Sequence, residues 1–161
     1  MSIRKIYQVI GVMSGTSMDG LDCSYIKTDG MQCVSIINEK TYDYSKTYRN
    51  NLRKIINLYK KNKKRKILKY DNYITNKILR ILKKFIKEHK IKKEEVDFIG
   101  LSGQTIYHNP KEKLSIQLGS PKIINKKLNI KIVGNFRNND IKNNGQGAPI
   151  GAFYHKYIIN K

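Results

Sequence analysis

The stretch GVMSGTSMDGLD, from Gly11 to Asp22, decides the fold of this chain. It follows an apolar run and places three glycines, three hydroxyl side chains and two carboxylates within twelve positions. The runs on either side, IYQVIGVM at 6–13 and LDCSYIKT at 21–28, have the composition of β-strands, and the second alternates apolar with polar residues. The sequence therefore predicts a β-hairpin whose loop carries the glycines and hydroxyls.

This loop has the composition of a phosphate cradle. Glycine lets backbone N–H groups approach an anion without a Cβ clash, and hydroxyls donate further hydrogen bonds to phosphate oxygens. Gly15, Thr16, Ser17 and Gly20 supply both kinds of donor. The loop is not a P-loop, because G-x-x-x-x-G-K-[ST] is absent and a strand is predicted after it. Tight hairpin turns use the same residues, so spacing alone leaves a plain turn as the alternative.

The carboxylates and a serine of the loop raise two further questions. Asp19 and Asp22 either position Mg²⁺ through water or order the loop, and their spacing does not decide between these roles. Ser17, in the string GTSM, is similar to the nucleophile of subtilisin-like proteases, in which an aspartate and a histidine precede the serine. No Asp or His precedes Ser17 here, so a serine-protease site is excluded.

The rest of the chain alternates strand and helix patterns. Further strands are predicted at 31–37, 96–103, 114–119 and 130–136. Helical spacing occupies 48–93, with an apolar face made of Ile74, Ile78, Ile81, Leu82, Phe85 and Ile86. A shorter helix follows at 120–129, with Ser120 placed to cap it and Pro121 at its first position. This order predicts an α/β fold, a mixed sheet with an N-terminal antiparallel hairpin meander and flanking helices.

The final segment, from Gly145 to Lys161, is predicted to form another helix that starts at Pro149. Phe153, Tyr157 and Ile158 form an apolar stripe on it. Because no later element follows for that stripe to contact, we expect an interrupted sequence, with the stripe marking where the missing half docks.

Charge is the strongest feature of the composition. The formal net charge is +21, from 33 Lys and Arg against 12 Asp and Glu. Such an excess favours nucleic acid or another polyanion as a partner, and KKNKKRK at 60–66 is a dense basic run. That run has no aromatic residues within it and matches no nucleic-acid motif. Since lysine is spread over the whole sequence, we expect solvated surfaces rather than a nucleic-acid site.

Cysteine spacing and hydropathy bear on the compartment. Cys23 and Cys33 lack C-x-x-C or zinc-type spacing, which predicts two reduced, packed thiols and no metal site. The apolar run at 6–13 is too short to span a membrane and has no cleavage site after it. We therefore expect a cytoplasmic protein with no membrane partner.

Three stretches together resemble one family, the anhydro-N-acetylmuramic acid kinases of bacterial peptidoglycan recycling. They are GVMSGTSMDGLD at 11–22, GLSGQTIYHNP with SIQLGSP within 100–121, and NFRNNDIKNNGQGAPI at 135–150. The resemblance spans essentially the whole chain but corresponds to roughly the first half of a family member. It implies the actin-like ATPase (ribonuclease H-like) fold, with residues 1–161 as the N-terminal lobe and the C-terminal lobe absent or on another chain.

The resemblance also implies the ligands and the residues that bind them. ATP and Mg²⁺ are the cofactors, and an amino sugar is the substrate. The ATP-binding segment is Gly15, Thr16, Ser17, Met18, Asp19, Gly20, Leu21 and Asp22. The substrate residues are Gln104, Thr105, His108, Arg137, Asp140 and Gln146. Arg137 either contacts the sugar's carboxylate or a phosphate, or it pairs with Asp140 across one turn.

The implied reaction is a coupled hydrolysis and phosphorylation. Water attacks the anomeric carbon of 1,6-anhydro-N-acetylmuramic acid, the anhydro bridge opens, and O6 takes the γ-phosphoryl group to give N-acetylmuramic acid 6-phosphate. The family's base lies in an Asp-Thr-Gly-Pro motif that this sequence lacks, so no catalytic residue is assigned and the chain alone is not expected to turn over. The rival function is a catalytically dead basic protein that binds nucleic acid or another polyanion.

Four positions depart from the family pattern. Ser102 stands where H-G-Q-T has histidine, and Ser120 stands where G-D has aspartate. Asn135 replaces the aspartate of D-F-R, and Asn144 replaces the first glycine of G-G-Q-G-A-P. A neutral amide at Asn135 cannot act as a base or offer a full charge to Mg²⁺, which puts any family role of that carboxylate in question.

Overall fold

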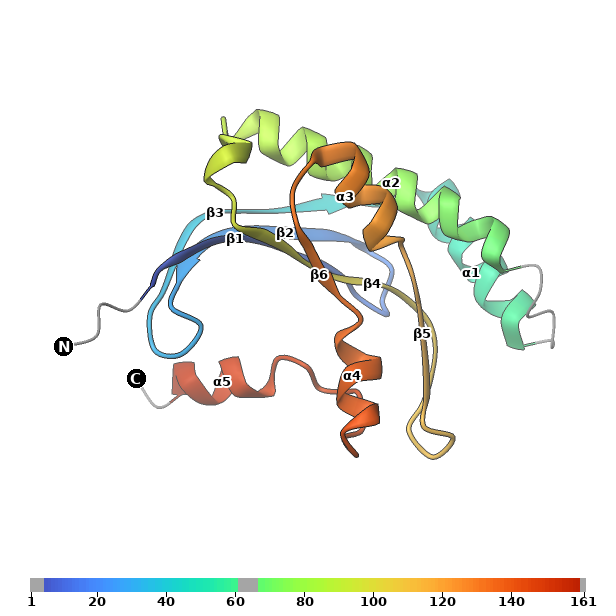
Figure 1. Cartoon of the computed structure of the whole chain (residues 1–161). Helices are drawn as coiled ribbons and strands as arrows, with labels where there is room; N and C mark the ends of the chain where they lie inside the picture. The colour runs from blue at the N-terminus through green and yellow to red at the C-terminus, as the bar shows by residue number, and fades with distance from the viewer. Residues whose placement is uncertain (1–4, 61–66, 160–161) are drawn as a thin grey trace.

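The structure is a computed structural model that describes residues 5–60 and 67–159 (Figure 1). Its described strands form one sheet: β1 (Tyr7–Ser14), β2 (Gly20–Thr28), β3 (Val34–Asp43), β4 (Phe98–Asn109), β5 (Leu114–Leu118) and β6 (Ile132–Gly134). Its helices are α1 (Lys46–Lys60), α2 (Leu68–Glu88), the 3₁₀ turn η2 (Lys93–Glu95), α3 (Pro121–Leu128), α4 (Phe136–Lys142) and α5 (Ala152–Ile159). The predicted α/β architecture is confirmed.

The sheet is mixed and starts with the predicted meander. Its strand order is β3-β2-β1-β4-β5, with β1–β2 and β2–β3 antiparallel and β1–β4 parallel. β4 is long enough for two of its parts to pair with different strands. Its Ile99–Leu101 part pairs in parallel with β6, and its Gln104–Asn109 part pairs antiparallel with β5.

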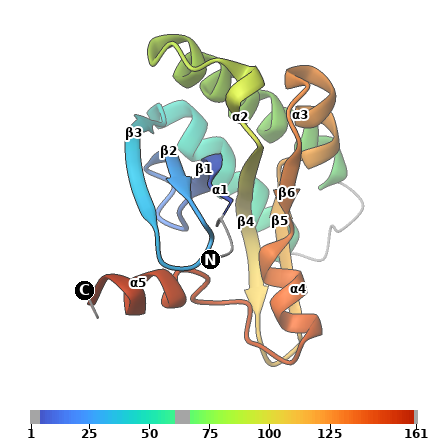
Figure 2. The ribbon, with the colours of Figure 1, turned by 60° about the vertical axis from the view of Figure 1, so that its left-hand side comes forward.

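Helices lie on both faces of this sheet. Figures 1 and 2 show α1, α2 and α3 over one face and α4 and α5 on the opposite side. The main core lies under α1–α3, and all six residues of the predicted apolar face of α2 are buried there. Phe85 is fully buried at the centre of that face. The 3.6-residue period thus identified the buried side of α2 correctly.

Local hydrogen bonds explain where two elements start. The predicted strand at 31–37 begins only at Val34, because Asp29 Oδ1 accepts the backbone N–H groups of residues 31, 32 and 33 at 2.8–2.9 Å. These amides are therefore part of a turn. The helix predicted to start at Pro149 begins at Ala152, where the His155 N–H first bonds the Gly151 carbonyl at 3.0 Å.

The capping prediction for α3 is confirmed. Pro121 is its first residue, and Ser120 Oγ accepts the Ile123 N–H at 3.4 Å. Two side chains of α2 hold the preceding turn, because Asp71 Oδ1 accepts the Gly119 N–H at 2.7 Å and Thr75 Oγ1 accepts the Ser120 N–H at 2.8 Å. α3 is thereby fixed against α2.

The two cysteines differ in burial. Both are free thiols, and Cys23 is buried as expected whereas Cys33 is exposed, because it lies in the Asp29 turn before β3. Burial raises the pKa of the Cys23 thiol to about 12, so it stays protonated at neutral pH.

Some predictions fall outside the described part. Most of the basic run at 60–66 lies outside the described residues, as do the side chains of Phe153, Tyr157 and Ile158. Among the helices of residues 5–60 and 67–159, none combines the length and apolarity that a membrane span requires.

Candidate phosphate-binding loop and its surroundings

The hairpin loop lies open at the end of β1 and β2. The Met18 N–H donates to the Gly15 carbonyl at 3.2 Å, and Met18 has a left-handed φ of 60° that closes the turn. The Thr16 and Ser17 side chains are exposed, and so is Asp19. The loop is therefore not packed shut, and its hydroxyls face solvent.

A buried polar network lies directly beneath the loop. Ser14 Oγ donates to Gln104 Oε1 at 2.6 Å, and the Tyr44 hydroxyl donates to Ser14 Oγ at 3.2 Å. Gln104 Nε2 donates to the Gly15 carbonyl at 3.4 Å, while the Tyr44 N–H donates to the Asp19 carbonyl at 2.7 Å. Burial raises the pKa of the Tyr44 hydroxyl to about 12, which keeps it a donor. Both ends of the loop are thus fixed.

Ser14 and Tyr44 were not among the predicted site residues. Ser14 bonds Gln104, 90 residues further along the chain, and Tyr44 bonds Ser14, 30 residues before it. No local sequence pattern indicates contacts over such separations. Gln104, predicted as a substrate residue, is 1% exposed and bonds only groups of its own chain. Its side chain bonds Ser14, the Gly15 carbonyl and the Thr105 carbonyl.

We predict that Gln104→Leu destabilises the chain and loosens the loop. The substitution removes the nearer of two acceptors of Ser14 Oγ, the other being the Gly20 carbonyl, and one of two donors to the Gly15 carbonyl, the other being the Met18 N–H. Each lost hydrogen bond contributes about 0.5–1.5 kcal/mol, so we expect a loss of about 1–3 kcal/mol in unfolding free energy. Urea unfolding measures the loss. Gln117→Leu is the matched control, because Gln117 is only half-buried and its side chain bonds Ser115 alone. Equal losses in the two variants would contradict a supporting role for Gln104.

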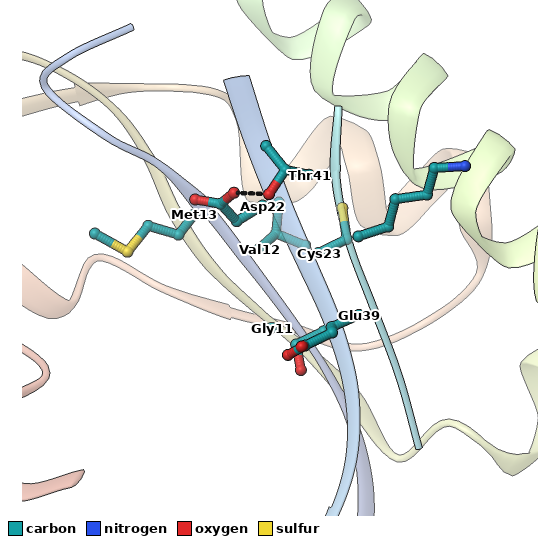
Figure 3. Close-up of a pocket in the computed structure, with 9 residues that line it drawn as sticks. Gly11, Val12, Met13, Asp22, Cys23, Glu39 and Thr41 are labelled. Carbon is teal, nitrogen blue, oxygen red and sulfur yellow. Dashed lines mark hydrogen bonds between the residues drawn. The ribbon is translucent and has the colours of Figure 1, made fainter. Parts of the chain in front are cut away.

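A hollow of about 630 Å³ lies beside the loop and is lined from three strands. Its lining residues are Gly11, Val12, Met13, Asp22, Cys23, Ser24, Glu39, Lys40 and Thr41. Figure 3 shows Met13 and Asp22 extending to the same side, with Asp22 Oδ1 accepting from Thr41 Oγ1 at 2.7 Å. Asp22 is exposed, whereas Gly20 and Leu21 are buried in the start of β2.

The second motif runs along β4. Thr105 is buried, and His108 is half-buried with its Nδ1 3.1 Å from Ser115 Oγ on β5. Ser102, which replaces the family's histidine, is half-buried and donates to the Gly103 carbonyl at 3.3 Å. Of this motif, the hydrogen bonds bring only Gln104 to the hairpin loop.

In the third motif, two side chains hold one residue, Gly147, and form what we call the clamp. Arg137 Nη1 donates to the Gly147 carbonyl at 2.8 Å, and Asp140 Oδ2 accepts the Gly147 N–H at 2.7 Å. Of the two alternatives for Arg137, the ion pair with Asp140 does not form among the described residues, because both side chains bond Gly147 instead. A Cβ at Gly145 would overlap the Asp140 carboxylate, so a side chain there would displace that carboxylate from the Gly147 N–H. Gln146, between the two glycines, is exposed.

Three of the four departures from the family pattern have a physical explanation. Asn135 (φ 64°) and Asn144 (φ 65°) adopt the left-handed conformation, which asparagine tolerates better than most side chains. Ser120 supplies the N-cap acceptor that aspartate also provides. The residues that this chain has at these three positions are therefore compatible with the clamp and with the N-cap of α3.

Metal ligands are sparse in this region. Within residues 5–60 and 67–159, no group of three or more His, Cys, Asp or Glu side chains lies close enough to hold a metal ion. Asp19 has one nearby cation, Arg49, whose Nη1 is 3.9 Å from Asp19 Oδ1.

The meander, the parallel β4 and the helices on both faces define the class of protein, a lobe of the actin-like ATPase fold. A model of the anhydro-N-acetylmuramic acid kinase family matches residues 7–161, and the chain belongs to this family. The resemblance of the three motifs is thereby confirmed.

Curated relatives agree with this assignment, and each is named "Anhydro-N-acetylmuramic acid kinase". The protein of Pelagibacter ubique (strain HTCC1062) is 39% identical, over 99% of this chain and 43% of the relative. Those of Rhodopseudomonas palustris (strain ATCC BAA-98 / CGA009) and Brucella canis are 34% and 32% identical, over 92% of this chain and 42% and 41% of the relatives. The chain thus spans less than half the length of these relatives.

Proposed function

We propose that this chain is the phosphate-binding lobe of an enzyme that uses ATP to phosphorylate 1,6-anhydro-N-acetylmuramic acid. The reaction opens the anhydro ring hydrolytically and gives N-acetylmuramic acid 6-phosphate, as part of peptidoglycan recycling. The observation that carries the proposal is the open loop at Gly15–Asp19, supported from beneath by the Ser14–Gln104–Tyr44 network. Family membership supports the substrate class.

The loop fits the phosphates of ATP. Thr16 and Ser17 offer two exposed hydroxyl donors, and the turn between Gly15 and Met18 is held without using either hydroxyl. Phosphate oxygens accept such donors strongly because they carry charge. We assign ATP binding to residues 15–22. Gly20 and Leu21 are buried at the start of β2, so their role is to hold the end of the loop in place.

The same region fits Mg²⁺ when it arrives with the nucleotide. Mg²⁺ keeps several waters and binds through one or two carboxylates plus phosphate oxygens, so a dedicated cage of protein ligands is not needed. Asp19 and Asp22 are exposed carboxylates at the loop and the hollow, and Thr41 orients Asp22. When bound, the ion neutralises charge that develops on the transferred phosphoryl group.

The substrate residues divide into two groups in this proposal. Gln104, Arg137 and Asp140 act through the groups that they hold. Gln104 bonds the Ser14 hydroxyl and the carbonyls of Gly15 and Thr105, and the other two bond the backbone of Gly147. The remaining residues, Thr105, His108 and Gln146, are assigned to contact with the amino sugar. Of these, Gln146 has the most exposed position.

Water activation is not assigned to this lobe. Attack on the anomeric carbon needs a carboxylate base, and the family's Asp-Thr-Gly-Pro motif does not occur in the 161 residues. The proposal therefore gives this lobe phosphate binding and substrate positioning, and it gives the base to a second lobe. A chimera tests the division: this chain replaces the aligned 43% of the Pelagibacter ubique relative, and ATP-dependent phosphorylation is measured.

We expect Ser17→Ala to raise the KM for ATP in this chimera about tenfold, because a hydrogen bond to a charged group is worth about 1.5–3 kcal/mol. Ser35→Ala is the matched control, since Ser35 is an exposed serine on β3 whose hydroxyl bonds none of the residues that the structure describes. Both variants keep the net charge, so unspecific attraction of ATP to the basic chain is unchanged. An unaltered KM in Ser17→Ala and Thr16→Val would refute the loop assignment.

A further inference from the structure

The proposed ATP loop has no positive charge of its own. Between Gly11 and Asp22 the sequence contains two carboxylates, Asp19 and Asp22, and neither lysine nor arginine. The rest of the chain differs, since lysine and arginine make up 33 of the 161 residues. The phosphates of ATP are multiply negative, and the two carboxylates repel them. Binding of ATP here therefore needs a cation from outside the loop.

Arg49 on α1 is the cation that the fold brings to this loop. Its Nη1 atom lies 3.9 Å from Asp19 Oδ1. Within residues 5–60 and 67–159, no other lysine or arginine has a side-chain nitrogen within 4.0 Å of the Asp19 or Asp22 carboxylate. The fold therefore places one guanidinium beside the loop, from a helix that the loop's own sequence does not include.

Tyr44 fixes the position of Arg49 relative to the loop. The Tyr44 N–H donates to the Asp19 carbonyl at 2.7 Å, and the Tyr44 hydroxyl donates to Ser14 Oγ at 3.2 Å. α1 starts two residues after Tyr44, and the Arg49 N–H donates to the Ser45 carbonyl at 3.0 Å. The backbone of Arg49 is thus held in the helix that Tyr44 ties to the loop, and its long side chain extends to Asp19.

The Arg49 guanidinium is available to a ligand. Its side chain is 38% exposed, and in the part of the chain that the structure describes none of its side-chain N–H groups is hydrogen-bonded. The 3.9 Å separation from Asp19 is too long for a hydrogen bond, and the Asp19 side chain is 71% exposed, so solvent weakens their attraction. A guanidinium carries five N–H donors in a planar fork that matches the oxygens of a phosphate. Exchange of Asp19 for a phosphate therefore gains charge-assisted hydrogen bonds and loses little.

We propose that Arg49 is a phosphate-binding residue of the ATP site. This role rests on the proposed function, because it takes the loop to be the place where the phosphates of ATP lie. When the nucleotide binds, the Arg49 guanidinium turns from Asp19 to a phosphate oxygen, while Thr16 and Ser17 donate as assigned above. Arg49 thus supplies the positive charge that the sequence of the loop lacks.

The test measures nucleotide affinity in the chimera with the Pelagibacter ubique relative. ATP and adenosine are titrated separately at constant ionic strength, in EDTA so that Mg²⁺ does not contribute. We expect Arg49→Gln to raise the Kd for ATP about tenfold and to leave the Kd for adenosine unchanged, because only ATP carries phosphate. The Kd of Arg49→Lys for ATP should fall between those of the parent and Arg49→Gln, since lysine keeps the charge but not the planar fork.

Arg53→Gln is the matched control. Arg53 lies one turn further along α1, is exposed, and donates to Asn50 Oδ1 at 3.1 Å. The substitution therefore removes the same charge from the same helix, and it should change the Kd for ATP less than about twofold. Equal effects of Arg49→Gln and Arg53→Gln would mean that only net charge matters, which overturns the proposal. An equal loss of ATP and adenosine affinity in Arg49→Gln also overturns it.

Asp19→Asn separates a phosphate contact from neutralisation of Asp19. If Arg49 binds phosphate, Arg49→Gln still raises the Kd for ATP about tenfold in the Asp19→Asn background. If Arg49 only offsets the charge of Asp19, Arg49→Gln has no effect in that background, and the proposal is overturned. A parent chimera that binds no ATP contradicts the proposed function as a whole. ATP binding that Ser17→Ala weakens and Arg49→Gln does not contradicts the role of Arg49 alone.

Discussion

Replacing Gly20 by alanine is expected to disrupt the loop and abolish ATP binding. A Cβ at this position would lie 2.8 Å from the Tyr42 carbonyl oxygen and 3.1 Å from Thr41 Cγ2. The carbonyl is backbone of the neighbouring strand, and it cannot move without breaking the β2–β3 pairing at Gly20 and Asp43. Overpacking of this kind costs typically about 1–3 kcal/mol in unfolding free energy, and here it also displaces the strand that ends the loop.

Gly100→Ala is the matched control, because Gly100 lies on β4, outside the proposed ATP-binding segment. A Cβ there would lie 3.8 Å from Phe136 Cζ, which is an ordinary van der Waals contact. Titration with ATP at fixed chloride and urea unfolding of both variants measure the contrast. We expect a small effect at Gly100 and a severe one at Gly20. Equal effects would mean that the β2–β3 edge does not set the loop's geometry.

Phe85→Ala is expected to give the largest loss of stability. Phe85 is fully buried beneath α2, with its ring centroid 6.5 Å from that of Tyr42 and at 88° to it. Truncating a buried phenylalanine costs about 3–5 kcal/mol, because the lost contacts leave a cavity. That is a large part of the 5–15 kcal/mol by which small domains are typically stable.

Urea unfolding followed by circular dichroism measures this loss. Met31→Ala serves as the control, since Met31 is 75% exposed in the turn before β3 and should lose less than about 0.5 kcal/mol. Comparable losses would contradict the placement of α2 over the sheet.

The spacing of apolar residues and the residues that form turns and helix caps predicted much of the fold. The face of α2 followed from apolar spacing, and the hairpin followed from two strand-like runs around a glycine-rich loop, the second of which alternates apolar and polar residues. The start of α3 followed from Ser120 and Pro121. α4 was not predicted, because its sequence FRNNDIK has few strong helix formers and its start at Asn135 has no side-chain cap. The late start of β3 depends on one side chain, Asp29, competing for backbone amides.

The part of the candidate site that is made of consecutive residues could be predicted from the sequence. The part that depends on contacts between distant residues could not. The loop could be found because its glycines and hydroxyls are consecutive. The roles of Ser14 and Tyr44 depend on contacts across the sheet, and a serine at the end of a strand gives no signal of its own. The same holds for Arg137 and Asp140, whose common partner Gly147 becomes visible only once the loop after α4 is folded.

Tyr44 joins the loop to the helix that follows it. Its N–H bonds Asp19, its hydroxyl bonds Ser14, and two residues later α1 begins. Because these bonds form when the chain folds, the loop's conformational entropy is lost then and not when a ligand arrives. Under the proposed function, the phosphate oxygens of ATP would therefore bind a loop that is already ordered, and binding would not include the free-energy cost of ordering it.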